Sequence, residues 1–180
     1  TADRPTAVAR YAVEEVVNHV AKATGVRLEV MTESAVKPGT ENRIFVGDCR
    51  AVRAAGIDVG KLPAEAFVLR ARDNMVVIAG DDGGGDPLDS DTRAGTLWGV
   101  YECLEQALKV RWLWPGELGT FVPQTRTVVV NDIHGIITPR FAQRKLRSGL
   151  GFTSEHPARG FTTEAFKQYS HDQTVFLRRH

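Results

Sequence analysis

Two β-rich runs joined by a two-residue turn constrain this chain more than any other feature. The runs AFVLRAR (66–72) and MVVIAG (75–80) flank Asp73-Asn74, which is the spacing of a β-hairpin. A hairpin pairs its two strands antiparallel, whereas a strict alternation of strand and helix gives a parallel sheet. We therefore expect a mixed sheet and not a doubly wound one.

Two amphipathic helices are predicted beside this sheet, over residues 6–24 and about 94–108. Each carries apolar residues at the spacing of one helical face. In the first helix these are Val13, Val16, Val17 and Val20, and in the second they are Leu97, Val100, Tyr101, Leu104 and Leu108. Gly25 is expected to end the first helix.

Further strands are predicted at 27–33, 43–47, 110–114 and 125–130, with one or two helical turns at 49–55. The first predicted element is a helix, so a strand that pairs at its edge of the sheet is expected upstream of residue 1. The set predicts an α+β fold with helices packed on a mixed sheet.

Composition excludes some functions for this 180-residue chain. Its net charge is +1, so no overall field attracts nucleic acid. No apolar stretch is long enough to span a membrane. The tail differs from the body, since residues 131–180 hold eight basic and four acidic residues, against 15 and 18 before them.

Known catalytic and metal-binding motifs are not found. GDDGGGD (80–86) lies between a strand and a helix, as phosphate loops do, yet it matches no phosphate-binding pattern and its acids repel phosphate. We interpret it as a solvated loop, with calcium as the alternative. His19 and the other histidines form no zinc motif, and Cys49 and Cys103 are predicted to be structural thiols. No cofactor is expected.

The stretch RWLWPGELGTFVP (111–123) has two tryptophans two positions apart. They could form an aromatic platform for a ligand such as a sugar, or they could pack in the core. In a strand over 110–114, Val110, Trp112 and Trp114 would share one face. Packing beneath the second helix explains this pattern better than a sugar platform. Trp114, beside the Pro115-Gly116 turn, is the better candidate for a contact with another domain.

The stretch GTLWGVYECLEQALKVRWLWPGELGTFVP (95–123) resembles the non-catalytic N-terminal domain that precedes the barrel of several glycoside hydrolases. These include β-N-acetylhexosaminidases, α-glucuronidases and a family of large bacterial proteins. The resemblance covers roughly residues 6–130. The residues of this stretch that match the family pattern are Gly95, Thr96, Leu97, Gly99, Val100, Tyr101, Leu104, Glu105, Arg111, Trp112, Pro115, Gly116 and Gly119. Trp98 and Cys103 replace a usual Tyr and Phe.

The resemblance implies a mixed sheet with two helices on one face, similar to the zincin architecture without its zinc site. It implies an accessory domain over 1–132 and, over 133–180, a linker and the first segment of a (β/α)8 barrel. In TPRFAQRKL (138–146), Arg144 matches a sugar-binding arginine of hexosaminidases, although Lys145 replaces a glycine there.

The function expected from this resemblance is that of an accessory domain, itself without catalytic residues, in a carbohydrate-active glycoside hydrolase. Its partners would be the downstream barrel and, through the whole protein, carbohydrate. Trp114 and Arg144 are the candidate substrate-binding residues. An autonomous carbohydrate-binding module and a structural domain of a surface protein with an inactive barrel remain alternatives. We expect a secreted, periplasmic or cell-surface location.

Overall fold

The computed structural model describes residues 1–37, 42–89, 91–132, 135–140, 174–176 and 178–179. The chain divides into two compact units. The first comprises Thr1–Val110 and Val122–Pro139, and the second comprises Arg111–Phe121 and Arg140–His180.

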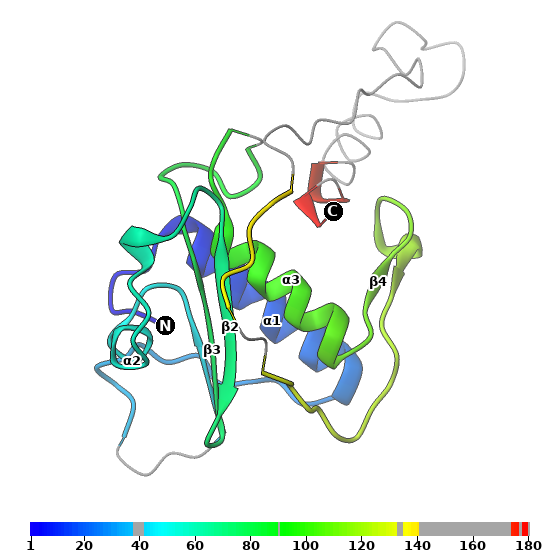
Figure 1. Cartoon of the computed structure of the whole chain (residues 1–180). Helices are drawn as coiled ribbons and strands as arrows, with labels where there is room; N and C mark the ends of the chain where they lie inside the picture. Colours follow the sequence, from blue (N-terminus) through cyan, green and yellow to red (C-terminus); the bar gives the residue numbers. More distant parts are fainter. Residues whose placement is uncertain (38–41, 90, 133–134, 141–173, 177, 180) are drawn as a thin grey trace, which may run out of the picture. The chain divides into compact units, whose positions relative to one another are not determined.

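A three-stranded mixed sheet forms the centre of the first unit (Figure 1). Strand β3 (Met75–Gly80) lies between β1 (Arg43–Val46), to which it is parallel, and β2 (Phe67–Arg72), to which it is antiparallel. The predicted hairpin is confirmed: Asp73 and Asn74 form its turn, with φ of 51° and 58°. Such left-handed pairs match the twist of the flanking strands. The predicted α+β class is therefore confirmed.

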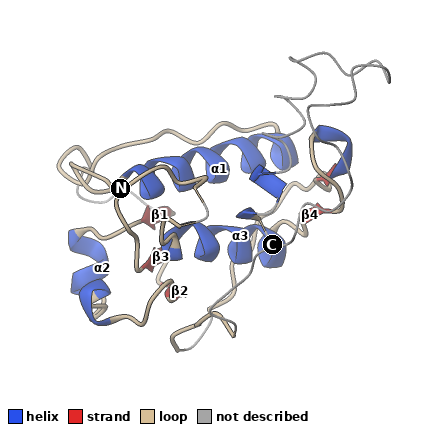
Figure 2. Cartoon of the chain, turned by 90° about the horizontal axis from the view of Figure 1, so that it is seen from above, coloured by secondary structure: helices blue, strands red, loops and turns tan. Residues whose placement is uncertain are grey.

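Helices cover both faces of this sheet (Figure 2). The long helices α1 (Ala7–Thr24) and α3 (Gly95–Ala107) pack side by side on one face, while the short α2 (Arg50–Ala54) lies on the other. The short η1 (Val59–Lys61) follows α2 in the chain. The predicted apolar stripes are buried except Val13, which is half-buried.

The ends of α1 follow from local chemistry. The Thr6 side chain accepts a hydrogen bond from the Ala9 amide at 3.0 Å, which satisfies one of the free donors of the first turn. Gly25 adopts φ 77° and ends the helix, as predicted.

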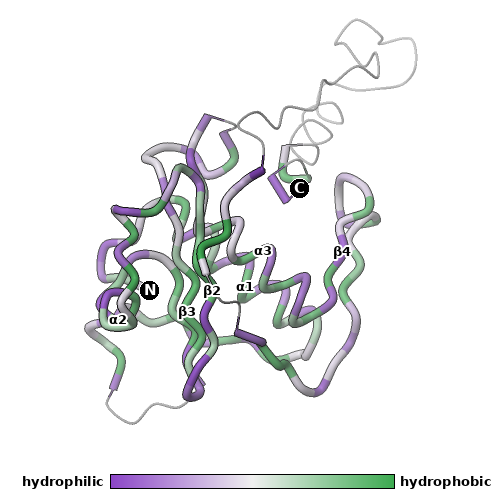
Figure 3. Tube along the Cα trace, viewed as in Figure 1, coloured by the Kyte–Doolittle hydropathy of each residue, from purple (hydrophilic) through white to green (hydrophobic). Residues whose placement is uncertain are grey.

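Successive side chains of each strand point to opposite faces of the sheet, so the sheet has one apolar layer on each face. Val77 and Ala79 face α2, in a cluster with Phe45, Cys49, Val52, Ile57 and Val68. Ile78 points to the opposite face, where its side chain lies against Gly99 of α3. Hydrophobic residues accordingly predominate along much of β2 and β3 (Figure 3).

Two predicted strands are wrong. Residues 27–33 and 125–130 are not assigned to strands, and neither run pairs into a ladder within the described residues. Val30 and Val129 are exposed. An alternation of apolar and polar residues is typical of a strand, but a strand also needs a neighbouring strand with which to pair.

Two polar residues of α1 are buried although neither belongs to the predicted apolar stripe. Glu15 and His19 are buried, and the Nδ1 atom of His19 lies 2.8 Å from the Glu15 carbonyl oxygen. The apolar stripe alone assigned the buried face, yet neighbouring elements cover more of the helix than that stripe.

Part of the predicted linker pairs with the sheet. Phe67 and Ile137 exchange two backbone hydrogen bonds of 2.9 Å, and the Ala71 amide donates to the Asp132 carboxylate. Residues on both sides of the predicted boundary at residue 132 thus contact β2. The division into an accessory domain and a barrel segment stays a prediction.

The second unit contains a small hairpin. Strands β4 (Arg111–Trp112) and β5 (Thr120–Phe121) are antiparallel, with the 3-10 turn η2 (Glu117–Gly119) between them. Near the C-terminus, the Arg179 guanidinium lies over the Trp112 ring, 5.4 Å from its centroid, within the range of a cation–π contact.

Candidate functional site

The tip of the β4–β5 hairpin is built by turn chemistry. Pro115 and Gly116, with φ 86°, bend the chain, and the Leu113 amide donates to the Gly119 carbonyl at 2.8 Å. A Cβ on Gly119 would lie 2.0 Å from the Trp114 carbonyl oxygen. Only glycine therefore fits where the two arms of the tip meet, and the predicted turn is confirmed.

The two tryptophans of this hairpin have different environments. Trp112 is 3% exposed and Trp114 is 61% exposed. The prediction that they share a strand face is wrong, because β4 ends at Trp112 and Trp114 already belongs to the bend that follows it. The prediction that Trp112 is buried is confirmed.

Exposed apolar side chains gather on this short segment. We call the set the hairpin patch: Leu113, Trp114, Leu118 and Phe121. Phe121 pairs with Arg111 and Trp112 pairs with Thr120, so Phe121 lies on the face that Trp112 does not use. Four large exposed apolar residues within nine positions are typical of an interaction surface rather than of scattered surface residues. Of this set, only Trp114 was predicted from the sequence, because residues in a turn lack the periodicity that marks one face of a strand or helix.

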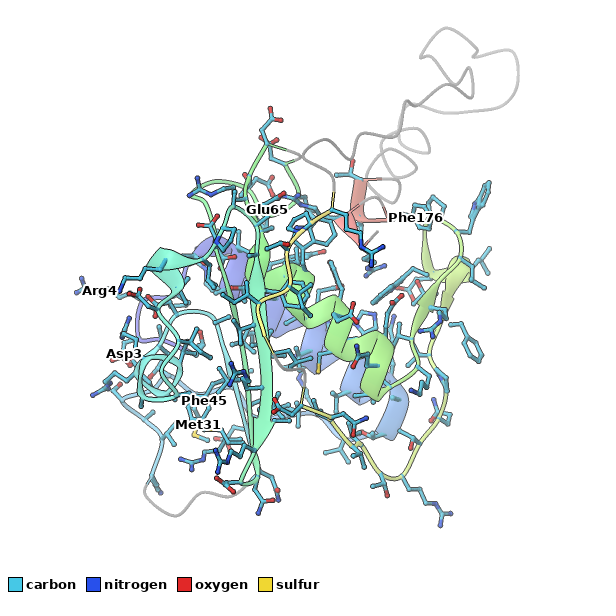
Figure 4. All side chains as sticks on the ribbon, viewed as in Figure 1. Asp3, Arg4, Met31, Phe45, Glu65 and Phe176 are labelled. Carbon is cyan, nitrogen blue, oxygen red and sulfur yellow. The ribbon has the colours of Figure 1, made fainter. Side chains whose placement is uncertain are left out.

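The acidic loop after β3 anchors helix α3. Asp82 accepts a hydrogen bond from the Thr96 amide at 2.8 Å and one from the Thr6 hydroxyl at 3.4 Å. Asp81 accepts from the Glu65 amide at 3.0 Å and forms an ion pair with Arg93 at 2.9 Å (Glu65 is labelled in Figure 4). These two acids are occupied in holding the first turn of α3 and the ends of the loop, so they do not form a free ligand set.

Burial raises the pKa of the Asp82 carboxyl from its ordinary 3.8 to about 6, and the nearby Asp81 adds to this effect. Hydrogen bonds from Thr96 and Thr6 oppose it, since they favour the charged form. The carboxylate is consequently held in a place where its charge is poorly solvated.

Other candidate groups do not converge. In the ranges that the structure describes, no three His, Cys, Asp or Glu residues are placed to hold a metal ion. Cys49 and Cys103 are buried free thiols, as predicted, and burial raises the pKa of Cys103 to about 12. Arg144 lies outside the described residues, so its predicted sugar contact stays a prediction.

Comparisons with known proteins assign no family. No protein-family model matches the chain, and no curated protein is significantly similar to it. Among the described residues, no helix is both long and apolar enough to cross a membrane.

The two tryptophans provide a matched test of this geometry. Trp112→Ala should lower the free energy of unfolding by roughly 3–5 kcal/mol, the range for a large aromatic side chain in a core. Trp114→Ala should change it by no more than about 0.5 kcal/mol, as expected of an exposed side chain. Urea melts of both variants measure this, and equal losses would mean that Trp114 is also buried.

Asp82 should give the unfolding free energy a distinct pH dependence. Its pKa is higher in the folded than in the unfolded chain, so the folded state binds the extra proton between about pH 4 and pH 6. Its contribution to stability is therefore present below that window and is lost as the pH rises through it.

Asp82→Asn should remove this dependence and keep the hydrogen bond to the Thr96 amide. The unfolding free energy of the variant, relative to wild type, should be higher at pH 7 than at pH 4. Denaturant melts across this range measure the difference. Asp86→Asn, an exposed change in the same loop, is the control; a pH-independent difference for Asp82→Asn would contradict the raised pKa.

Proposed function

We propose that the chain is the N-terminal accessory domain of a carbohydrate-active glycoside hydrolase and supplies a packing surface to a catalytic barrel. The hairpin patch carries this proposal. It lies within the stretch on which the resemblance to such domains rests, residues 95–123. It presents large apolar side chains that a partner surface would cover.

The fold is compatible with this role. A mixed sheet with α1 and α3 on one face agrees with the coarse α+β architecture that the resemblance implies, and the zincin-like arrangement is part of the proposal. The barrel itself would begin near TPRFAQRKL (138–146) and would carry the catalytic groups at the carboxyl ends of its strands. Arg144 would contact sugar there.

Autonomous carbohydrate binding is the alternative that a specific observation favours. Trp114 is exposed beside a hydrogen-bonded turn, and an exposed tryptophan can present a flat apolar face to a ligand. The accessory role explains more of the surface, because Leu113 and Leu118 are also exposed, and aliphatic side chains offer no flat ring on which a sugar could stack.

The test uses the isolated chain and the same domain within the full-length hydrolase. Leu118→Glu should leave the unfolding free energy of the isolated chain within about 0.5 kcal/mol of wild type. In the full-length protein it should lower both the melting temperature and the glycosidase activity, because a charge would be buried at the interface. Val129→Glu, an exposed change in the first unit, is the control and should have neither effect.

The isolated chain should neither hydrolyse chromogenic hexosaminides and glucuronides nor bind oligosaccharides. Titration with oligosaccharides, followed by tryptophan fluorescence, separates the two roles. Saturable binding that Trp114→Ala abolishes would support the carbohydrate-binding alternative. An unchanged full-length Leu118→Glu protein would contradict the accessory role.

A further inference from the structure

The sheet face on which α2 packs also carries three arginines. Arg43 of β1 and Arg72 of β2 are both paired with Met75 of β3, and directly opposite residues share one face of a sheet. Met75 packs against the apolar cluster under α2, which identifies the face. In the next row across the sheet, Phe45 and Arg70 lie on either side of β3. We call Arg43, Arg70 and Arg72 the arginine cluster.

Two members of this cluster have no acidic partner. Arg43 and Arg70 are half-buried, and neither forms an ion pair or a side-chain hydrogen bond with a described residue. Arginine is almost never buried by protein unless it is paired. The basic residues of the neighbouring α2 and η1, by contrast, all pair with carboxylates: Arg50 with Asp3 and Glu33, Arg53 with Asp48, and Lys61 with Asp58.

The stems of these two arginines are held by packing. The Nε atoms of Arg43 and Arg70 are buried and have no hydrogen-bond partner among the described residues, which is uncommon for a buried donor. The Arg43 guanidinium lies over the ring of Phe45, labelled in Figure 4, at 5.6 Å from its centroid. Packed stems leave the terminal nitrogens, Nη1 and Nη2, for a ligand. They also reduce the side-chain entropy that binding would cost.

Arg72 supplies a third positive charge. Its Nε atom lies 3.4 Å from the Asp73 carboxylate, but the two side chains are 84% and 86% exposed, and such a pair is worth little. Two strand spacings of about 4.8 Å place Arg43 and Arg72 about 10 Å apart at the backbone. Their long side chains can therefore reach one anion above Met75, which lies between them.

We propose that the arginine cluster binds the dianionic phosphate group of a small phosphate monoester, held mainly by Arg43 and Arg70. One arginine fork already satisfies the two oxygens of a carboxylate. A phosphate group presents three acceptor oxygens, so it accepts from both forks at once, and its charge balances two unpaired guanidinium groups. Met75, which is half-buried, would contact the organic part of the ester. The proposal does not rest on the hairpin patch or on the proposed function.

The test titrates the chain with phenyl phosphate at constant ionic strength, since salt screens exposed charges. NMR of the arginine Nε–H groups reports binding at each residue. Both Arg43 and Arg70 should show saturable shifts with one dissociation constant. Arg43→Gln and Arg70→Gln should each weaken binding by at least about tenfold, the loss expected when a charge-assisted hydrogen bond is removed. Arg53→Gln, which changes a paired arginine of α2, is the control and should leave the affinity unchanged.

Shifts that do not saturate, or an equal loss of affinity in Arg53→Gln, would overturn the proposal. Urea melts show whether each variant folds. If the glutamine variants do not fold, Arg43→Lys and Arg70→Lys replace them, because lysine keeps the charge and loses the fork. The lysine variants should also weaken binding, and unchanged affinity in both would contradict recognition by the two arginine forks.

Three further anions distinguish the class of ligand. Acetate should bind more weakly than phenyl phosphate, and equal affinity would overturn the proposal in favour of a carboxylate. Dimethyl phosphate carries a single charge, so it should also bind more weakly; equal affinity would favour a phosphate diester instead. Inorganic phosphate should bind at the same arginines but less tightly, because it lacks the organic part that contacts Met75. Equal affinity for inorganic phosphate would overturn the assignment to an ester in favour of the free ion.

Discussion

The close approach of helix α3 to strand β3 is the contact on which the rest of the first unit depends. Gly80 ends the strand and Gly95 begins the helix, and a Cβ on Gly80 would lie 2.3 Å from the carbonyl carbon of Gly95. The Thr96 hydroxyl accepts from the Gly80 amide at 3.0 Å, and Asp82 accepts from the Thr96 amide. Two glycines thus permit the contact, and two polar side chains fix its geometry.

This junction sets the positions of the functional features within the first unit. Helix α3 packs on β2 and β3, and α1 packs beside α3. Val13, Val16 and Val17 of α1 line a groove beside β1. The junction also explains the acidic loop, whose first two acids stabilise the helix start. Asp82 is retained there although its charge is poorly solvated, because its hydrogen bond satisfies an amide that the helix cannot.

Local patterns predicted much of this fold, whereas contacts between distant segments were not predictable. Asp73-Asn74 specified the hairpin because the turn is decided by adjacent residues, and the apolar spacing specified both long helices. The burial of Glu15 and His19 depends on elements far away in the sequence. Trp114 was assigned to a strand that ends at Trp112, because the bend at 114–116 follows it. The link from Asp82 to Thr96 crosses a loop that has no motif. The exposure of Trp114 could be predicted only in part, from its place beside the turn.

Replacing Gly95 by Ala tests the junction most directly. Alanine is the better helix former by about 1 kcal/mol, so the variant would be more stable if α3 had room. The contact predicts the opposite: the new Cβ would lie 2.5 Å from the Ala66 carbonyl oxygen, and the unfolding free energy should fall by about 1–3 kcal/mol. Gly84→Ala, where no atom lies within 4 Å of the added Cβ, should change it by no more than about 0.5 kcal/mol. A Gly95→Ala chain as stable as wild type in urea melts would contradict the account.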